Sequence, residues 1–579
     1  MRPIRDVSLA EKFGQLPCTE QESSPLIVVK LGGSVLRSVH DLPRAAGELY
    51  RLVRAGRRVI AVVSAFEGET DRLFELARQA GGTETNGIAD LVSLGEEKSA
   101  AALRIACGRI GLDAMIVRPE ELCIHTSGER LQADPEFIHL PALVRLSTAH
   151  EILIMPGFVG LDDQGRRTLL GRGGSDFSAI FIAGETGAAL RLCKDVDGVF
   201  DHDPAAEPPN LKRYRRIGWQ ECLAVARPLL QPRAVAYACG KRLRIEVAAL
   251  GSANPTIVDA ETESPEPVVE RPPLRIGLAG FGTVGQALQA RLEEESGFEI
   301  AAILVRDLEK IRRTMPAVPL LDDRSAFFER GFDILVDATG GSEVGKALTM
   351  RQLAGAHHVV SANKAVIAAN LRALRGLQAW GGRLRYSATV GGSAPMLELA
   401  RRARSRGPVN EAVGVLNGTV NFLLDEMSRG LSFDEALAMA RKAGFAESDP
   451  AADLSGADAA AKLGILAAEI WGEAGLDLPI EVQPLDEALC GIITASGERW
   501  LQVSRLTLKH GRPAGAICFV PAAEVPDFPP LPGEWNYLIL RSDSGQALKA
   551  SGRGAGGAPT AEAIVADLID IAADRDSSG

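Results

Sequence analysis

The chain has 579 residues, more than one hydrophobic core usually supports, so we expect at least two independently packed domains. Its composition, with 46% hydrophobic, 24% charged and 5% aromatic residues, is typical of soluble α/β enzymes and excludes a mainly disordered protein. The net charge of −11 is spread along the chain without a block of Lys or Arg, which argues against nucleic acid and anionic membranes as partners and favours small-molecule substrates.

The cysteines and the apolar runs bear on where the protein works. Its eight cysteines stand singly at wide intervals, with no CxxC pair. We therefore interpret them as reduced thiols and expect neither a disulfide framework nor a zinc site. The first residues lack the apolar stretch of a secretion signal, and no run reaches the roughly 18 apolar residues that cross a bilayer. We expect a cytoplasmic protein with no membrane partner.

The first predicted domain covers residues 25–258, after a polar segment, 1–24, that we expect to be poorly ordered. Short apolar runs alternate there with helical stretches rich in Ala, Leu, Arg and Glu, which is the pattern of a mainly parallel sheet between helices. The predicted strands lie within residues 25–33, 57–65, 151–160, 188–196 and 244–250. Residues 259–272 are rich in Pro and Glu and form the expected linker to the next domain.

The second predicted domain begins at residue 273. Residues 273–295 give a strand, a glycine turn and an amphipathic helix, and further apolar strands follow at 299–307, 333–339 and 357–363. This order of strands and helices is that of a nucleotide-binding parallel sheet. We therefore expect a Rossmann-type domain at the start of the second half.

The glycine turn carries a dinucleotide-binding pattern, GxGxxG, between a strand and a helix. Its first glycine permits a tight turn, its second lets the backbone approach a pyrophosphate, and its third packs the helix against the strand. Arg306 follows the next strand, where a guanidinium can bind a 2′-phosphate, so NADP fits as well as NAD. The alternative is that the glycines only close a turn in a sheet that binds nothing. The expected cofactor loop consists of Gly280, Gly282, Thr283, Val284 and Gly285.

A cluster of carboxylates precedes a predicted helix further along the chain. The cluster consists of Glu447, Asp449, Asp453 and Asp458, and the helix carries Lys462 four residues after the last of them, on the same face. Carboxylates that hold an ammonium group beside a lysine that handles a proton suit the reduction of an amino-acid aldehyde. The alternative is a solvated acidic cluster at a helix N-terminus.

Six motifs of the second half stand in a fixed order between residue 274 and about residue 571. They are GFGTVG, VVSANKA, YSATVGGSAP, GVLNGTVNFLL, GFAESDPAADLSGADAAAKL and GRGAGGAPTAEAIVADL. Through these motifs this part of the chain resembles homoserine dehydrogenase. The resemblance implies hydride transfer from NAD(P)H to L-aspartate 4-semialdehyde, giving L-homoserine, a step of threonine and methionine biosynthesis. It also implies a Rossmann-type domain over 273–385, completed by about 550–575, and an α+β catalytic and dimerisation domain over 386–549.

The same resemblance implies roles for single residues. Lys364 and Lys462 are the expected lysines of the proton-transfer and substrate site, and Glu447, Asp453 and Asp458 orient them. The implied substrate-binding residues are Glu447, Asp449, Asp458 and Lys462. Thr339 and Asn363 are the residues implied beside the nicotinamide, and Lys364 is a further implied cofactor-binding residue.

One departure from the resemblance concerns a monovalent cation. The family often has a glutamate where Ser387 stands, and that carboxylate contributes with backbone carbonyls, here around Val390, to a sodium site. Without the glutamate, we expect at most a weak sodium site formed by the Val390 backbone. Dehydrogenases of this family are commonly dimers, so the resemblance also implies a homodimer or a larger homo-oligomer.

The first half carries three motifs that suit phosphoryl transfer. KLGGS, from Lys30 to Ser34, ends a predicted strand, where its lysine and backbone N–H groups can meet phosphates. GRGGSD precedes a helix and offers Arg172 for a substrate carboxylate. KDVDGV, from Lys194 to Val199, follows another strand. Taken singly, each motif can also be a glycine-rich turn of an α/β domain.

Residues 27–258 resemble the amino-acid kinase fold, specifically aspartate kinase, through VVKLGGS, VVSAF, SLGEE, MPGFVG, LLGRGGSD, KDVDGVFDHDP and LLQPRAVAYA. The resemblance implies an α/β sandwich that phosphorylates L-aspartate from ATP with Mg²⁺. Lys30 and Ser34 then face the phosphates, Glu96 and Arg172 hold aspartate, and the segment around Asp197 lies near ATP. The complete implied kinase site is Lys30, Gly32, Gly33, Ser34, Glu96, Arg172, Gly174, Ser175, Asp176, Asp195 and Asp197.

One position of the kinase-like half departs from its family. The family's nucleotide-side lysine aligns with Pro228, which carries no charge, and Arg227 beside it is the available substitute. Two hypotheses follow. The chain is either a bifunctional enzyme, or a homoserine dehydrogenase whose kinase-like half is a catalytically silent assembly or ligand-sensing domain.

Overall fold

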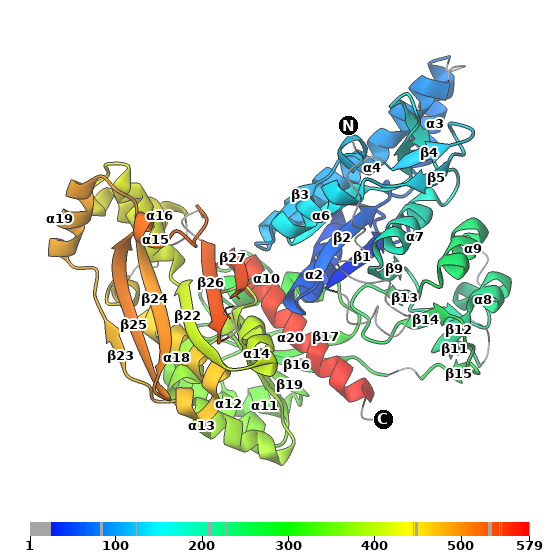
Figure 1. Ribbon diagram of the computed structural model, residues 1–579. Helices are drawn as coiled ribbons and strands as arrows, with labels where there is room; N and C mark the ends of the chain where they lie inside the picture. The colour runs from blue at the N-terminus through cyan, green and yellow to red at the C-terminus, as the bar shows by residue number, and fades with distance from the viewer. Residues whose placement is uncertain are drawn as a thin grey trace. The chain divides into compact units, whose positions relative to one another are not determined.

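The computed structural model describes residues 25–577, except for 82–84, 123, 207, 209, 226–228, 270, 444, 446–449, 531–534, 544 and 546. The chain forms two compact units (Figure 1). The first comprises the described residues up to Arg271 without Arg109–Gly111, and the second comprises Arg109–Gly111 and the residues from Pro272 onward. No helix in the described part of the chain is long and apolar enough to cross a membrane.

The first unit is built on an eight-stranded sheet with the strand order β12-β14-β13-β9-β1-β2-β6-β3. Its neighbouring strands are parallel except for the antiparallel pair β13 and β14. The central strands are apolar on both sides because helices cover both faces of a parallel sheet. The bounds are β1 Leu26–Leu31, β2 Arg58–Val63, β3 Ala114–Ile116, β6 Ile152–Pro156, β9 Ala189–Lys194, β12 Arg216–Gly218, β13 Ile245–Ala249 and β14 Thr256–Asp259.

The helices of the first unit include one that is buried on nearly every side. This helix, α7, spans Gly174–Thr186, packs against β1, β9 and α9, and is buried at every residue from Gly174 to Ala183. The packing brings its N-terminus to the carboxyl ends of β1 and β9. The helices are α2 Leu42–Arg54, α3 Glu69–Gln79, α4 Thr85–Arg109, α5 Pro119–Leu122, α6 Leu140–Ala149, α7 Gly174–Thr186, α8 Trp219–Val225 and α9 Pro232–Lys241.

Two smaller sheets complete the first unit. One has the strand order β5-β4-β7-β8 and the other β10-β11-β15. In the second of these, β15 pairs antiparallel with β11, so part of the segment expected to be a linker adds a short strand to the first unit. The bounds are β4 His125–Ser127, β5 Asp134–Phe137, β7 Val159–Leu161, β8 Arg167–Leu169, β10 Val199–Phe200, β11 Lys212–Tyr214 and β15 Glu266–Pro267.

The second unit begins with a six-stranded parallel sheet, in the order β18-β17-β16-β19-β20-β21. In chain order this is 3-2-1-4-5-6, the arrangement of dinucleotide-binding domains, which bind their ligand at the carboxyl ends of the strands. The strands are β16 Leu274–Ala279, β17 Phe298–Leu304, β18 Leu320–Leu321, β19 Ile334–Asp337, β20 His358–Ser361 and β21 Leu384–Arg385. The helices are α10 Thr283–Leu292, α11 Arg324–Glu329, α12 Ser342–Ala354 and α13 Lys364–Leu377.

The last helix of the chain, α20 (Gly557–Ser577), returns to this domain and packs along α10 (Figure 1). The buried Arg291 of α10 lies 3.0 Å from Glu562 of α20, an ion pair between residues far apart in the sequence. The chain thus leaves the nucleotide-binding domain, forms the next sheet and comes back to it.

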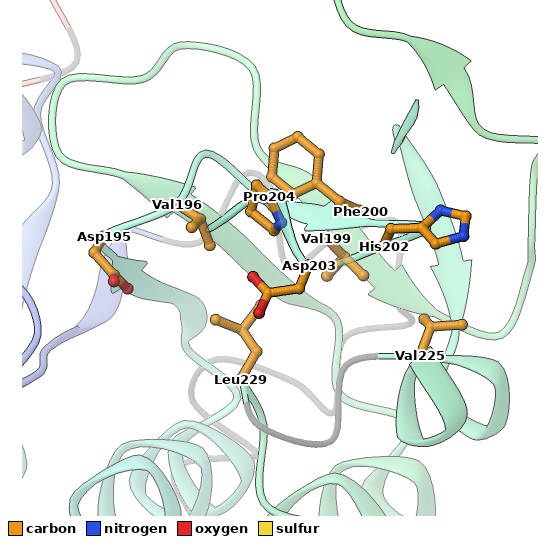
Figure 2. Close-up of a pocket in the computed structure, with 10 residues that line it drawn as sticks. Asp195, Val196, Val199, Phe200, His202, Asp203, Pro204, Val225 and Leu229 are labelled. Atoms are coloured by element: carbon orange, nitrogen blue, oxygen red, sulfur yellow. The ribbon is translucent and has the colours of Figure 1, made fainter. Parts of the chain in front are cut away.

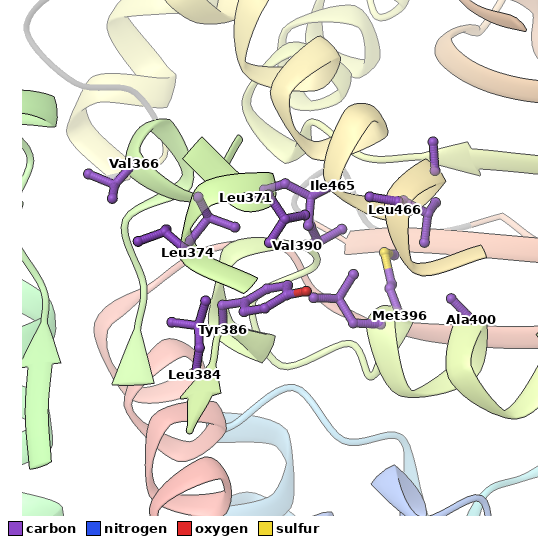
Figure 3. Close-up of a cluster of buried hydrophobic side chains, with 14 of the residues drawn as sticks. Val366, Leu371, Leu374, Leu384, Tyr386, Val390, Met396, Ala400, Ile465 and Leu466 are labelled. Atoms are coloured by element: carbon purple, nitrogen blue, oxygen red, sulfur yellow. The ribbon is translucent and has the colours of Figure 1, made fainter. Parts of the chain in front are cut away.

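The remaining sheet of the second unit has the order β23-β25-β24-β22-β26-β27, antiparallel except for the pair β23 and β25. Helices α13, α14 and α18 form a common apolar core with it (Figure 3). The strands are β22 Val409–Val415, β23 Ile480–Val482, β24 Trp500–Lys509, β25 Arg512–Pro521, β26 Trp535–Ser542 and β27 Ala547–Arg553. The helices are α14 Met396–Arg406, α15 Gly418–Ser428, α16 Phe433–Ala443, α17 Ala451–Leu454, α18 Ala457–Trp471 and α19 Glu487–Ser496.

Candidate active sites

The glycine turn of the second unit leaves an open side at the N-terminus of α10. Gly280 has a φ of +96°, and a Cβ there would lie 2.5 Å from the carbonyl oxygen of Ala338. A Cβ on Gly285 would lie 2.3 Å from the carbonyl oxygen of Gly280, so this glycine lets the helix approach the strand. A Cβ on Gly282, the N-cap residue of α10, would meet no atom within 4 Å. The open side fits a pyrophosphate, which free N–H groups at a helix N-terminus bind.

Three hydrogen-bonded residues, Asp337, Thr339 and Asn363, lie at the ends of β19 and β20, two strands of the sheet that carries the glycine turn. The side chain of Asp337 is fully buried and accepts hydrogen bonds from the N–H and the hydroxyl of Thr339, at 3.0 and 2.6 Å. Burial raises the pKa of Asp337, while the bonds from Thr339 oppose the rise. Asn363 Nδ2 donates to Thr339 Oγ1 at 3.1 Å, and Asn363 Oδ1 caps α13. The two residues expected beside the nicotinamide therefore hold each other in place.

Lys364, the first residue of α13, faces a second lysine across one carboxylate. Lys364 Nζ lies 2.9 Å from Asp458 Oδ1, and Lys462 Nζ lies 2.8 Å from Asp458 Oδ2. Burial would raise the pKa of Asp458, but the ammonium groups of Lys462 and Lys364 outweigh it and hold this pKa well below its usual range. Asp458 is also in the first turn of α18, where a helix dipole favours a negative charge. The carboxylate therefore stays ionised between two cations.

The turn between β22 and α15 supplies further partners of this centre. Lys462 Nζ donates to the Leu416 carbonyl oxygen at 2.7 Å. Asn417 caps α15 with its Oδ1, and its Nδ2 donates to Asp453 Oδ1 at 2.9 Å and, more weakly, to Asp458 Oδ2 at 3.5 Å. Burial, and then the charge of Asp458, raise the pKa of Asp453. Asn417 thus links the two aspartates. The other two residues of the acidic cluster, Glu447 and Asp449, lie outside the described residues.

A related arrangement lies at the carboxyl ends of β1 and β9 in the first unit. Lys30 Nζ is 2.7 Å from Asp176 Oδ1, and Lys194 Nζ is 2.9 Å from Asp176 Oδ2. All three side chains are about nine-tenths buried. Burial would raise the pKa of Asp176, but the two ammonium groups outweigh it and lower this pKa to about 2. Burial lowers the pKa of Lys30, and its pairing with Asp176 opposes that change.

Glycines keep the space around these lysines open. A Cβ on Gly32 would lie 2.5 Å from Lys30 Nζ and 3.9 Å from Ser34 Oγ. Gly33 packs against the Ala65 carbonyl, which a Cβ there would meet at 3.4 Å. The N-cap residue of α7 is a glycine with φ of +71°, and Gly174, Ser175 and Asp176 form the first turn of that helix. The KLGGS loop and the helix N-terminus therefore face the same lysines, with free backbone N–H groups at hand.

Glu96 is a buried carboxylate of α4 with an unused oxygen. Its Oε1 accepts a hydrogen bond from the Ala65 N–H at 3.2 Å, whereas Oε2 has no partner among the described residues. Burial raises the pKa of Glu96 to about 7, although the Ala65 N–H opposes the rise. Such an oxygen suits the ammonium group of a small substrate. Arg172, the residue paired with it in the expected site, is exposed in the turn before α7.

A cavity of about 280 Å³ lies beside the Lys194 end of β9. Figure 2 shows Asp195 at one end of it and His202 and Val225 at the other, with Leu229 between them. Asp197 does not line this space; its Oδ1 accepts from the Ala249 N–H at 3.3 Å. The lining is mainly apolar, which fits a purine base, and it includes Leu229, whose carbonyl oxygen accepts a hydrogen bond from Lys194 Nζ at 2.8 Å.

Family models match both units. The model of the homoserine dehydrogenase NAD-binding domain matches residues 280–387, that of homoserine dehydrogenase matches 395–569, and that of the amino acid kinase family matches 25–237. A homoserine dehydrogenase from Synechocystis is 31% identical over 316 residues, which are 52% of this chain and 73% of that protein. The chain belongs to the homoserine dehydrogenase family. The two family resemblances and the expected fold class are confirmed.

The part of the first unit that the amino acid kinase family model matches has curated relatives of its own. An aspartokinase from Helicobacter pylori is 37% identical over 203 residues, which are 35% of this chain and 50% of that protein. The chain thus spans about half the length of that aspartokinase. Among solved structures, a homoserine dehydrogenase from Thiobacillus denitrificans is 28% identical, with a TM-score of 0.47, and covers 53% of this chain and 74% of its own.

Sequence reasoning missed two residues of these sites. The sequence analysis named Lys194 only as the first residue of KDVDGV and gave it no role. A lysine at a strand end beside a glycine-rich loop is the signal that could have identified it as a site residue. Asn417 follows a strand and precedes a helix in LNGT, which indicates an N-cap but not a contact with two aspartates. Arg227 and Pro228 lie outside the described residues, so the substitution proposed for Pro228 stays a prediction.

The surroundings of Ser387 bear on the expected sodium site. Ser387 Oγ lies 2.8 Å from Asp567 Oδ1 and 2.5 Å from Glu398 Oε1, and its N–H donates to Asp567 Oδ2 at 2.9 Å. Two carboxylates, Glu398 of α14 and Asp567 of α20, thus contact Ser387, the position where the family often has a glutamate. The described residues contain no cluster of three or more His, Cys, Asp or Glu that could hold a metal ion. Sodium at the Val390 backbone stays a prediction.

Arg306 is exposed just beyond β17, the position where the sequence predicts contact with a 2′-phosphate. We expect Arg306→Ala to raise the KM for NADPH by about tenfold or more, because it removes a charge-assisted hydrogen bond, and to leave the KM for NADH unchanged. Steady-state kinetics with both cofactors check this, with the exposed Arg330→Ala as control. Equal losses for the two cofactors would exclude Arg306 as the selecting residue.

The pKa of Glu96 predicts how aspartate use depends on pH. Below about 7 the carboxyl is protonated and neutral, so it cannot pair with an ammonium group. We expect kcat/KM for aspartate to rise with pH and to level off above about 7. Glu96→Gln should weaken aspartate use and abolish that inflection. The same inflection in Glu96→Gln would assign it to another group.

Proposed function

We propose that the second unit reduces L-aspartate 4-semialdehyde to L-homoserine with NADPH or NADH. The observation that carries this proposal is the Lys364–Asp458–Lys462 centre. Lys364 directly follows Asn363, which is bonded to Thr339 at the ends of the cofactor-binding strands. The centre therefore adjoins the place where a nicotinamide bound on the open glycine turn would end.

In this proposal a nicotinamide cofactor supplies the hydride when it is bound. The lysines of the centre do the proton chemistry: as the aldehyde oxygen gains negative charge, an ammonium group donates a proton to it. Asp458 pairs with both lysines and keeps them oriented. Asp453, with the Glu447 and Asp449 that the sequence places beside it, holds the substrate ammonium group. In the reverse direction a neutral lysine accepts the proton of the homoserine hydroxyl.

We further propose that the first unit phosphorylates the side-chain carboxylate of L-aspartate with ATP. The Lys30–Asp176–Lys194 cluster beside a cavity of about 280 Å³ supports it. Glu96 holds the substrate ammonium group and Arg172 its α-carboxylate. Mg²⁺ fits a site of this kind, since it binds through one or two carboxylates together with the phosphates, and Asp195 at the end of the cavity is the described candidate.

Two assays on one preparation of the full chain test these activities. The first follows NADPH formation from homoserine and NADP. The second traps aspartyl phosphate as its hydroxamate after incubation with aspartate and ATP. A hydroxamate signal that Lys30→Ala abolishes, with unchanged homoserine oxidation, would establish a bifunctional enzyme. Homoserine oxidation without any hydroxamate would mean that the kinase domain is kept for assembly or ligand binding.

A further inference from the structure

Lys194 is buried beside Lys30 and Asp176, and its ammonium group uses only two of its three hydrogen-bond donors on described residues. Its Nζ donates to Asp176 at 2.9 Å and to the Leu229 carbonyl oxygen at 2.8 Å. A lysine ammonium has three donors, and the third has no partner among the described residues. Leu229 lines the cavity, and Asp195, the next residue along the chain, lies at its end (Figure 2). Lys194 Nζ is therefore bonded to the backbone of a residue that lines the cavity, and it keeps one donor unused within the described part of the chain.

The charges of the cluster do not balance. Asp176 carries one negative charge, while Lys30 and Lys194 both approach it within 3 Å and are both buried. A buried cation without a counter-charge is costly, so an excess positive charge at this depth calls for an anion. Under the function proposed above, Arg172 pairs with the α-carboxylate of aspartate. The side-chain carboxylate is the nucleophile, and its charge is used to form the new bond to phosphorus. The anion that neutralises the cluster is therefore a polyphosphate that enters from the cavity.

We propose that Lys194 is a phosphate-binding residue of the phosphoryl-transfer site, acting beside Lys30 on the nucleotide. The proposal rests on the aspartate kinase function proposed for the first unit. In the reaction a bond forms between an aspartate carboxylate oxygen and the γ-phosphorus, and the bond from that phosphorus to the β-γ bridging oxygen breaks with its electron pair on ADP. Lys194 stabilises the charge that develops on the departing ADP. Lys194, at the end of β9, would then supply the positive charge that the family's lysine provides at the position of Pro228.

The test compares Lys194→Met and Lys194→Arg with Lys241→Met, a change at the end of α9 that leaves the cluster intact. Binding of ATP and of adenosine is measured by calorimetry, and hydroxamate formation and homoserine oxidation are measured on the same full-length proteins. We expect Lys194→Met to weaken ATP binding by about tenfold or more and to lower kinase turnover by about a hundredfold or more. Adenosine binding and homoserine oxidation should stay unchanged, and Lys194→Arg should recover part of the ATP affinity.

The outcomes distinguish a failure of the proposed role of Lys194 from a failure of the proposed aspartate kinase function. If the unsubstituted protein forms no hydroxamate, the kinase function fails, whereas a tenfold loss of ATP over adenosine affinity in Lys194→Met would still support a phosphate-binding role for Lys194. If the unsubstituted protein is an active kinase and Lys194→Met keeps its ATP affinity and turnover within twofold, the inference is wrong. Equal losses of ATP and adenosine affinity would also overturn it, because they would show a structural role.

Discussion

Lys462→Ala is expected to lower the turnover of homoserine by about 10²–10⁴-fold, the usual contribution of a positioned general acid or base. The lysine is buried, it pairs with Asp458, and it donates to the Leu416 carbonyl, so its ammonium group has a fixed position. The loss should appear in kcat, because the proton is transferred in the chemical step. NADPH binding should change little, because the glycine turn and the Thr339–Asn363 pair do not involve Lys462.

Stopped-flow kinetics and NADPH fluorescence titration measure the two quantities separately. Lys549→Ala, a change at an exposed lysine of β27 in the sheet that shares a core with α18, is the matched control and should leave both unchanged. Lys364→Ala shows whether the second lysine shares the proton transfer or only positions Asp458. Unchanged homoserine turnover in Lys462→Ala would remove this lysine from the chemistry and with it the proposed centre.

The parts of the sites that the sequence predicted are those that local geometry dictates. GxGxxG between a strand and a helix requires a left-handed first glycine and a third glycine without a side chain, and Gly280 and Gly285 meet these demands. The spacing of Asp458 and Lys462 put both on one helical face, and the two side chains do pair. The order of strands and helices likewise predicted the Rossmann-type sheet.

Contacts between distant elements could not be predicted in this way. Lys364 and Lys462 lie on different helices, and both contact Asp458. Only the family resemblance, and not their spacing in the sequence, predicted that they share one site. Lys194 reaches Asp176 because β9 and α7 pack against each other, a contact that no spacing within either element shows. The capping residue Asn417 gained its second role from the same kind of tertiary packing.

The two units share one electrostatic arrangement. In each, two lysines from different elements meet a single aspartate in the first turn of a helix, Asp176 in α7 and Asp458 in α18. A carboxylate there is stabilised by the helix dipole as well as by the cations. The carboxylate also compensates the electrostatic repulsion between the two ammonium groups, so they can lie close together. Both proposed reactions develop negative charge on a substrate oxygen, and a pair of fixed ammonium groups stabilises that charge.

Asp176→Asn is therefore expected to abolish the kinase activity while homoserine oxidation continues. The amide leaves Lys30 and Lys194 facing each other without a counter-charge, so both lose the partner that fixes their position. Breaking a buried ion pair in this way costs about 3–5 kcal/mol of stability. Hydroxamate formation and thermal unfolding measure the two effects. Asp163→Asn, at a side chain that is 93% exposed, is the matched control and should change neither.

The stability difference between Asp176→Asn and the unsubstituted protein should itself depend on pH. The pKa of Asp176 is about 2 in the folded protein, below the roughly 3.9 of an unfolded chain. A lowered carboxyl pKa contributes stability that is fully present above the unfolded value and is lost as the pH falls through the folded one. The difference should therefore be constant from pH 8 to about 5 and shrink from about 4 toward 2. A difference that instead grows as the pH falls would show that Asp176 is not the ionised partner of the two lysines.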